Sequence, residues 1–151
     1  MGNVCYVPLA GGESVSFALP NPAAGADWLY TIPAGYEYEI RALQCKLICS
    51  LVVADRRPLF VIYDTAGNDH WRLYFSPANY TLAGETSVFS LYVGCQRTDY
   101  SFLTVVTSRQ NNDTLPYNRL PAGYQIGTAF GGLDAADQWS EIRINALRWR
   151  V

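Results

Sequence analysis

Short segments in which apolar and polar residues alternate are the feature that most limits how this chain can fold. Residues 139–149 place Ile142, Ile144 and Ala146 on one side, and Ser87 to Val93 repeats the pattern with every second residue apolar. A period of two puts successive side chains on opposite faces of a β-strand. Because such segments recur along the chain with Gly, Pro and Asn between them, the sequence predicts an all-β sandwich or barrel.

Further strands are expected between these. Leu59 to Tyr63 is apolar on both faces, and the turn residues of "DTAGND" separate it from the alternating "HWRLYF", which predicts a hairpin. Phe102 to Thr107 is expected to form another strand, and Val15 to Leu19 a short one.

Tyr36 to Arg57 is the longest stretch without Gly or Pro, and it fits two patterns. Some of its apolar residues match a helical stripe, whereas Leu43 to Val53 alternates strictly. The alternating set is longer and includes the β-branched "SLVV", so we predict a long strand. The apolar residues change from even positions at Ile40 to odd positions at Leu43, so the side chains that face inward shift by one residue. This predicts a bend near Arg41.

The tetrapeptide PAGY occurs twice, at 33–36 and 121–124. Pro suits the second position of a type I turn and Gly the fourth, so the word predicts a turn that leads into a strand opening at Tyr. Duplication of a larger unit is the other reading. The residues that follow the two copies differ, which favours the turn.

Composition points to contact with other protein. Only 16% of residues are charged and 14% are aromatic, so much of the surface is uncharged. The net charge of −2 argues against a nucleic-acid partner. No apolar run is long enough for a membrane span, and the start does not resemble a secretory signal, so we expect no membrane association.

No cofactor, metal or enzymatic activity is predicted. Cys45 and Cys49 would lie about 13 Å apart on one side of a strand, too far for a disulfide, so the cysteines read as reduced core residues. The single histidine, His70, reads as a solvated turn residue rather than a general base. "DTAGND" lacks the later Glu that closes a calcium loop.

One domain is expected for a chain of 151 residues. Residues 1–27 are rich in Gly, Pro, Ala and Ser, which predicts an extended N-terminal arm, with a frayed terminus as the alternative. Residues 28–151 would then form the sandwich.

The last predicted strand carries a candidate contact surface. Strict alternation puts Trp139, Leu147 and Trp149, with Arg143, on the face opposite Ile142. Such a face is costly to leave in water, which favours an intermolecular contact. The alternative is that the strand is core on both sides.

Three segments, "IPAGYEYEIRALQCKLICS", "ADRRPLFVIYDTAGN" and "LPAGYQIGTAFGGLDAADQWSEIRINALRW", resemble the jelly-roll head decoration or cement proteins of tailed bacteriophages. The resemblance covers the stretch from Trp28 to the C-terminus as a pattern of turns and strands. It implies an antiparallel β-sandwich of jelly-roll type, made in the host cytoplasm and located on the capsid surface of the virion. The implied partners are the major capsid protein and copies of the chain itself in a homotrimer.

On this reading the protein stabilises the head and is not an enzyme. The residues expected to make protein contacts are Arg56, Arg57, Trp139, Arg143, Trp149 and Arg150. Similar jelly rolls also serve as tail, adaptor or fibre components, so the alternative is a glycan- or receptor-binding module.

Overall fold

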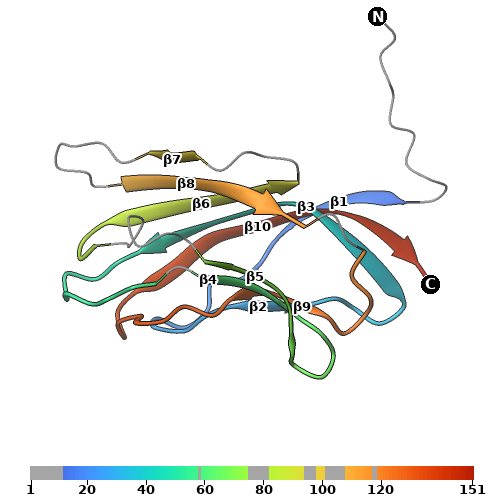
Figure 1. Cartoon of the computed structure of the whole chain (residues 1–151), viewed down its shortest axis with the longest axis horizontal. Coiled ribbons are helices and arrows are strands. Elements are labelled where there is room, and N and C mark those ends of the chain that lie inside the picture. Colours follow the sequence, from blue (N-terminus) through green and yellow to red (C-terminus); the bar gives the residue numbers. More distant parts are fainter. Residues whose placement is uncertain (1–11, 58, 75–81, 94–97, 101–107, 117–118) are drawn as a thin grey trace, which may run out of the picture.

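The computed structural model describes residues 12–57, 59–74, 82–93, 98–100, 108–116 and 119–151. These residues form ten strands and no helix. The strands lie in two sheets that face each other, as Figure 1 shows. The predicted all-β sandwich is confirmed.

The larger sheet has six strands in the order β1-β10-β3-β6-β8-β7. Neighbours run antiparallel except β6 and β8, which are parallel, so the predicted antiparallel arrangement holds for all pairs but this one. The strands are Glu13–Ala18 (β1), Gln138–Arg150 (β10), Tyr36–Ile48 (β3), Thr86–Val93 (β6), Ser108–Leu115 (β8) and Thr98–Tyr100 (β7).

The smaller sheet has four antiparallel strands in the order β2-β9-β4-β5. They are Leu29–Thr31 (β2), Gln125–Thr128 (β9), Leu59–Tyr63 (β4) and Asp69–Tyr74 (β5). The hairpin expected from "LFVIY" and "HWRLYF" is β4 and β5. The strand expected at Phe102 to Thr107 lies outside the described residues.

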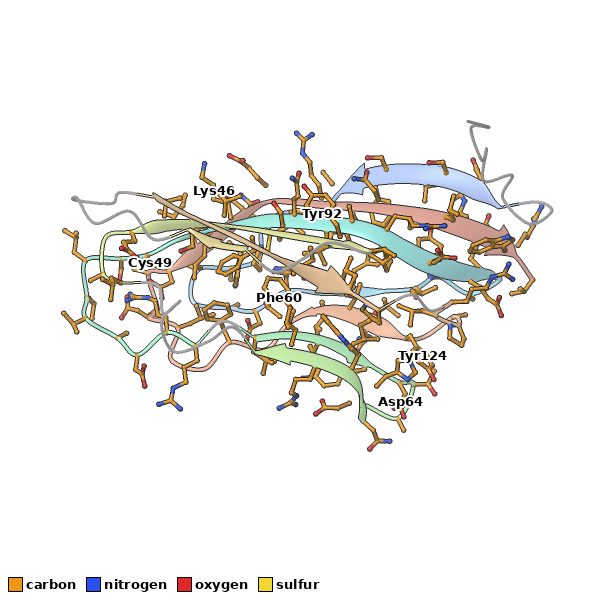
Figure 2. All side chains as sticks on the ribbon, turned by 45° about the horizontal axis from the view of Figure 1, so that its top comes forward. Lys46, Cys49, Phe60, Asp64, Tyr92 and Tyr124 are labelled. Atoms are coloured by element: carbon orange, nitrogen blue, oxygen red, sulfur yellow. The ribbon has the colours of Figure 1, made fainter. Side chains whose placement is uncertain are left out.

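The core fills the space between the two sheets. Its centre is a cluster of aromatic rings, in which Trp139 lies 5.1 Å from Phe130, 5.8 Å from Phe89 and 6.4 Å from Phe60 between ring centroids. Cys45 and Cys49 are buried and free, as predicted for reduced core residues. Figure 2 shows Phe60 between the two layers.

The bend predicted near Arg41 is a β-bulge in β3. Asn145 of β10 pairs with Ala42, and the next residue, Ala146, pairs with Ile40. Arg41 is therefore the extra residue of the bulge, with no residue of β10 directly across from it. The extra residue changes which side chains face inward, as the shift in apolar phase indicated. The strand ends at Ile48, however, and the predicted continuation through "SLVV" is wrong, because residues 49–55 form a loop.

A second bulge, in β10, overturns the predicted facing of Trp139. Ser140 pairs with Lys46 and Arg143 with Gln44, so Glu141 and Ile142 together lie opposite Cys45. Glu141 takes a φ of 52°, the left-handed region. Trp139 and Ile142 therefore both point into the core, each with no more than 1% of its surface exposed.

The two PAGY turns join the sheets and lie side by side. The first carries the chain from β2 into β3 of the other sheet, and the second leads into β9 of the smaller sheet. The N–H of Gly123 donates to Ile32 O at 2.9 Å, the N–H of Ile32 donates to Tyr124 O at 2.9 Å, and Tyr38 bridges to Leu120. Ile32, just before the first turn, thus pairs with residues of the second turn. Leu120, just before the second turn, pairs with Tyr38, which follows the first turn.

The turn type differs from the one predicted. In the second copy the N–H of Tyr124 donates to Pro121 O, which places Gly123 third in the turn rather than fourth. Gly35 and Gly123 have φ of 80° and 84°, and a positive φ at the third position is the requirement of a type II turn.

The predicted arm is part of the sandwich over its described length. β1 pairs with β10 at the edge of the larger sheet, which confirms the short strand expected there. Phe17 packs 4.9 Å from Tyr30 between ring centroids, and Gly25 N–H donates to Asp137 O at 2.7 Å. We therefore assign residues 12–27 to the sandwich, while residues 1–11 lie outside the description.

Candidate functional site

An apolar loop projects from the end of the sandwich where β3 stops. Leu51 and Val53 are 87% and 90% exposed, although both are large aliphatic residues. The loop is tied to residues 82–85, because the N–H of Gly84 donates to Ser50 O and the N–H of Cys49 donates to Glu85 O. We call the exposed aliphatic side chains of these two segments the apolar tip: Ile48, Leu51, Val52, Val53 and Leu82.

A buried ion pair supports the loop from inside. Arg56 has no exposed surface, and its Nε donates to Asp137 Oδ2 at 2.6 Å while Nη2 donates to Oδ1 at 2.8 Å. This two-point geometry fixes the guanidinium in one orientation. The pair links the loop after β3 to the start of β10.

Ser50 connects that ion pair to the loop backbone. Its N–H donates to Asp137 Oδ1 at 2.8 Å and its hydroxyl to Asp134 Oδ1 at 2.8 Å. Arg56 Nη2 donates to the carbonyl of Val52 at 3.0 Å, and the N–H of Val52 donates to Ser50 Oγ at 3.3 Å. The apolar tip is therefore held on a polar frame rather than left as a free loop.

The charges in this frame are stabilised in their ionised forms. Burial alone raises the pKa of Asp137, but hydrogen bonds from Arg56 and from the N–H groups of Ser50 and Asp134 outweigh it, and the pKa is lowered. The N–H of Ala136 and the Ser50 hydroxyl lower the pKa of Asp134. Burial raises the pKa of the Cys49 thiol to about 12, so that this thiol is not a reactive nucleophile.

The six residues predicted to make protein contacts do not form one surface. Arg56 and Trp139 are buried, and their contacts lie within the chain. Arg57 is exposed near the apolar tip and pairs with Asp55 at 2.6 Å. Arg143 is exposed on the outer face of the larger sheet, and Arg150 at the far end of β10.

Trp149 is not an open platform either. It is only 8% exposed, because the guanidinium of Arg119 stacks over its ring at 3.8 Å and Gly12 packs against the indole. The contact roles of Arg57, Arg143, Trp149 and Arg150 remain predictions. Sequence reasoning missed the apolar tip, because "LVV" read as a continuing strand rather than an exposed loop.

The polar residues of the β4–β5 hairpin, which the sequence singled out, make contacts within the chain. Asp64 uses its carboxylate to accept bonds from the N–H groups of Ala66 and Asn68 and from the Asn68 side chain, which closes its own turn. His70 is exposed and packs edge-on against Tyr124 at 5.2 Å. No group of three His, Cys, Asp or Glu side chains in these parts of the chain is placed to hold a metal.

Comparison with known proteins adds no relative. The chain matches no known family, no curated protein and no solved structure. A search of the described residues for helices able to cross a bilayer finds none.

Proposed function

We propose that this chain is a non-enzymatic structural protein of a virus particle, a decoration or cement protein that binds the major capsid protein and stabilises the head. The observation that carries the proposal is the apolar tip. Its two most exposed residues, Leu51 and Val53, sit on a loop that a buried ion pair fixes in place. A rigid apolar surface in water is a feature of protein interaction sites.

The strand order supports the jelly-roll part of this proposal. Without β7 and β8, the sheets become β1-β10-β3-β6 and β2-β9-β4-β5. Eight strands in two four-stranded sheets, with the chain crossing repeatedly between them, is the arrangement of a jelly roll. The fold on its own does not give a function, so the tip and the earlier resemblance supply the choice.

Burial of the apolar tip provides the driving force for docking. Full burial of one Val or Leu side chain contributes about 1.5–3 kcal/mol. A single subunit with so small a surface binds weakly, and a homotrimer on a symmetric shell multiplies the contacts. The polar frame under the tip limits the entropy lost on binding, since the loop is already ordered.

A sedimentation experiment tests the proposal. Purified protein is mixed with shells of the same virus's major capsid protein that lack it, and the pelleted fraction is measured. We expect stoichiometric binding by the natural protein and at least about a tenfold weaker binding by the Leu51→Ser, Val53→Ser double variant. The double variant should fold normally because both side chains are already in water.

Leu29→Ser is the matched control. Leu29 is 46% exposed on β2 of the other sheet, outside the apolar tip, so this variant should bind shells like the natural protein. Failure of the natural protein to pellet with any shell would overturn the proposal. Equal loss in the control would show that the tip is not the contact.

The alternative is a tail, adaptor or fibre component that binds glycan through aromatic faces. It calls for several exposed rings on one face, whereas the tryptophans of the described chain are buried or half-buried, Trp149 is covered by Arg119, and Tyr92, 36% exposed, is the large aromatic side chain open to solvent in this part of the chain. The apolar tip therefore favours decoration.

A further inference from the structure

A hollow of about 220 Å³ lies on the outer face of the larger sheet, next to the apolar tip. Six residues of β3, β6 and β10 line it: Gln44, Cys45, Lys46, Val88, Glu141 and Arg143. Lys46 and Ile48 are two apart in β3, so they point to the same side about 7 Å from each other. Figure 2 shows Lys46 and Tyr92 on this outer side.

The bulge at Glu141 lies in the wall of the hollow. Two residues of β10 lie opposite the single Cys45, and Glu141 is the one non-glycine residue of the described chain with a positive φ. That conformation costs about 1–2 kcal/mol for an L-residue. From this position the Glu141 side chain reaches Lys46 on the neighbouring strand.

The hollow carries one net positive charge. Lys46 Nζ lies 3.1 Å from Glu141 Oε1, so these two charges offset each other. Arg143 has no carboxylate within ion-pair distance among the described residues, and its guanidinium is exposed. With two cations and one carboxylate on its lining, the site has room for one more anion.

Neighbouring groups hold the rest of the lining in place. Gln44 Nε2 donates to the Tyr92 hydroxyl at 2.8 Å and lies 3.4 Å from Ser90 Oγ, which orients the amide along one wall. Val88 adds a half-buried apolar wall. A site with fixed walls and one unpaired guanidinium suits a small planar anion.

We infer that the hollow receives the carboxylate of one Asp or Glu side chain on the protein against which the apolar tip packs. The inference rests on the proposed function and adds the chemistry of the partner surface. That surface would carry an apolar patch with an acidic residue close beside it. Arg143 makes a two-point pair with that carboxylate. The apolar contact beside it excludes water and strengthens the pair.

Three single variants test the inference in the shell-binding assay at low and at physiological salt. Arg143→Gln should bind at least about tenfold more weakly and lose most of the salt dependence. Glu141→Gln should bind about two- to fivefold more tightly, because it removes the carboxylate that offsets Lys46. Arg72→Gln, which replaces an exposed arginine of β5 in the smaller sheet, outside the hollow and the apolar tip, should not change binding.

The results separate this inference from the function it rests on. Binding by Arg143→Gln and Glu141→Gln that equals the natural protein, while the tip double variant still fails, overturns the hollow alone. Failure of the natural protein to bind shells overturns both. A third outcome would identify the occupant as an acidic sugar. In that case glucuronate binds saturably to the free protein, Arg143→Gln loses this binding, and neither Arg143→Gln nor Glu141→Gln changes binding to shells.

Discussion

Arg56 Nε donates a hydrogen bond to Asp137 Oδ2 at 2.6 Å although the two residues are 81 positions apart, and neither side chain is exposed to solvent. The pair joins the loop that carries the apolar tip to the beginning of β10. Its removal therefore tests whether the tip depends on a long-range contact.

Replacing one partner should be strongly destabilising. We expect Arg56→Met and Asp137→Asn each to lower the free energy of unfolding by about 3–5 kcal/mol, because each leaves its former partner buried without a counter-charge. Urea denaturation followed by tryptophan fluorescence measures the change. Arg57→Gln is the neighbouring control and should cost less than about 1 kcal/mol, since its pair with Asp55 is exposed. Equal costs at 56 and 57 would contradict the buried role.

Acid should weaken the same frame. The folded state lowers the pKa of Asp137 below its ordinary value of 3.8, chiefly because hydrogen bonds from Arg56 and two backbone N–H groups outweigh burial. A depressed pKa gives stability that is complete above the unfolded pKa and is lost as the pH falls through the folded pKa. We expect a constant free energy of unfolding from about pH 7 to about pH 5 and a fall below about pH 4. Constant stability down to about pH 2 would contradict the charged pair.

The strained residue in β10 offers a pair of opposite substitutions. Glu141→Gly should stabilise the fold by up to about 1 kcal/mol, because glycine adopts a φ of 52° without steric cost. Glu141→Ala keeps the strain and loses the contact to Lys46, so it should be neutral or slightly destabilising. Melting temperatures distinguish the two. A lower melting temperature for the glycine variant than for alanine would show that the bulge is not strained.

Two glycines should respond very differently to alanine. A Cβ at Gly127 in β9 would overlap the carbonyl oxygen of Trp28, so β2 and β9 would have to separate. A Cβ at Gly35 would meet nothing within 4 Å, and only its φ of 80° is unfavourable. We expect about 1–2 kcal/mol of destabilisation at Gly35 and clearly more at Gly127 in chemical denaturation. A smaller effect at Gly127 would mean that the strands tolerate the shift.

Local patterns in the sequence predicted strands at β1, β3, β4, β5, β6 and β10, but not at β2, β7 or β8. The phase shift between Ile40 and Leu43 located the bulge at Arg41, because the extra residue changes the alternation directly. The bulge at Glu141 left a weaker signal: Trp139 and Ile142 are three apart, and a strict period of two assigns them to opposite faces. The presence of two large apolar residues at that odd spacing was the available sign.

Long-range pairing was not readable from the chain. Arg56 was predicted at a contact surface, whereas it is buried and its partner, Asp137, lies 81 positions away at the start of β10. The same contact ends β3 early by fixing Ser50 and Val52 in a loop, which is why the β-branched "LVV" is exposed rather than paired. Propensity favours a strand at these residues, and the tertiary contact overrides it.

Ile48 of the apolar tip is the last residue of β3. Along its length β3 is paired with β10, and over about half of it with β6. In Figure 1 the loop after β3 and the C-terminus lie at opposite ends of the molecule. A pull on the tip therefore acts along the strands. It loads many ladder bonds in shear at the same moment, whereas a pull across the sheet would open them one by one. A chain held at this point and at its C-terminus would therefore resist mechanical unfolding.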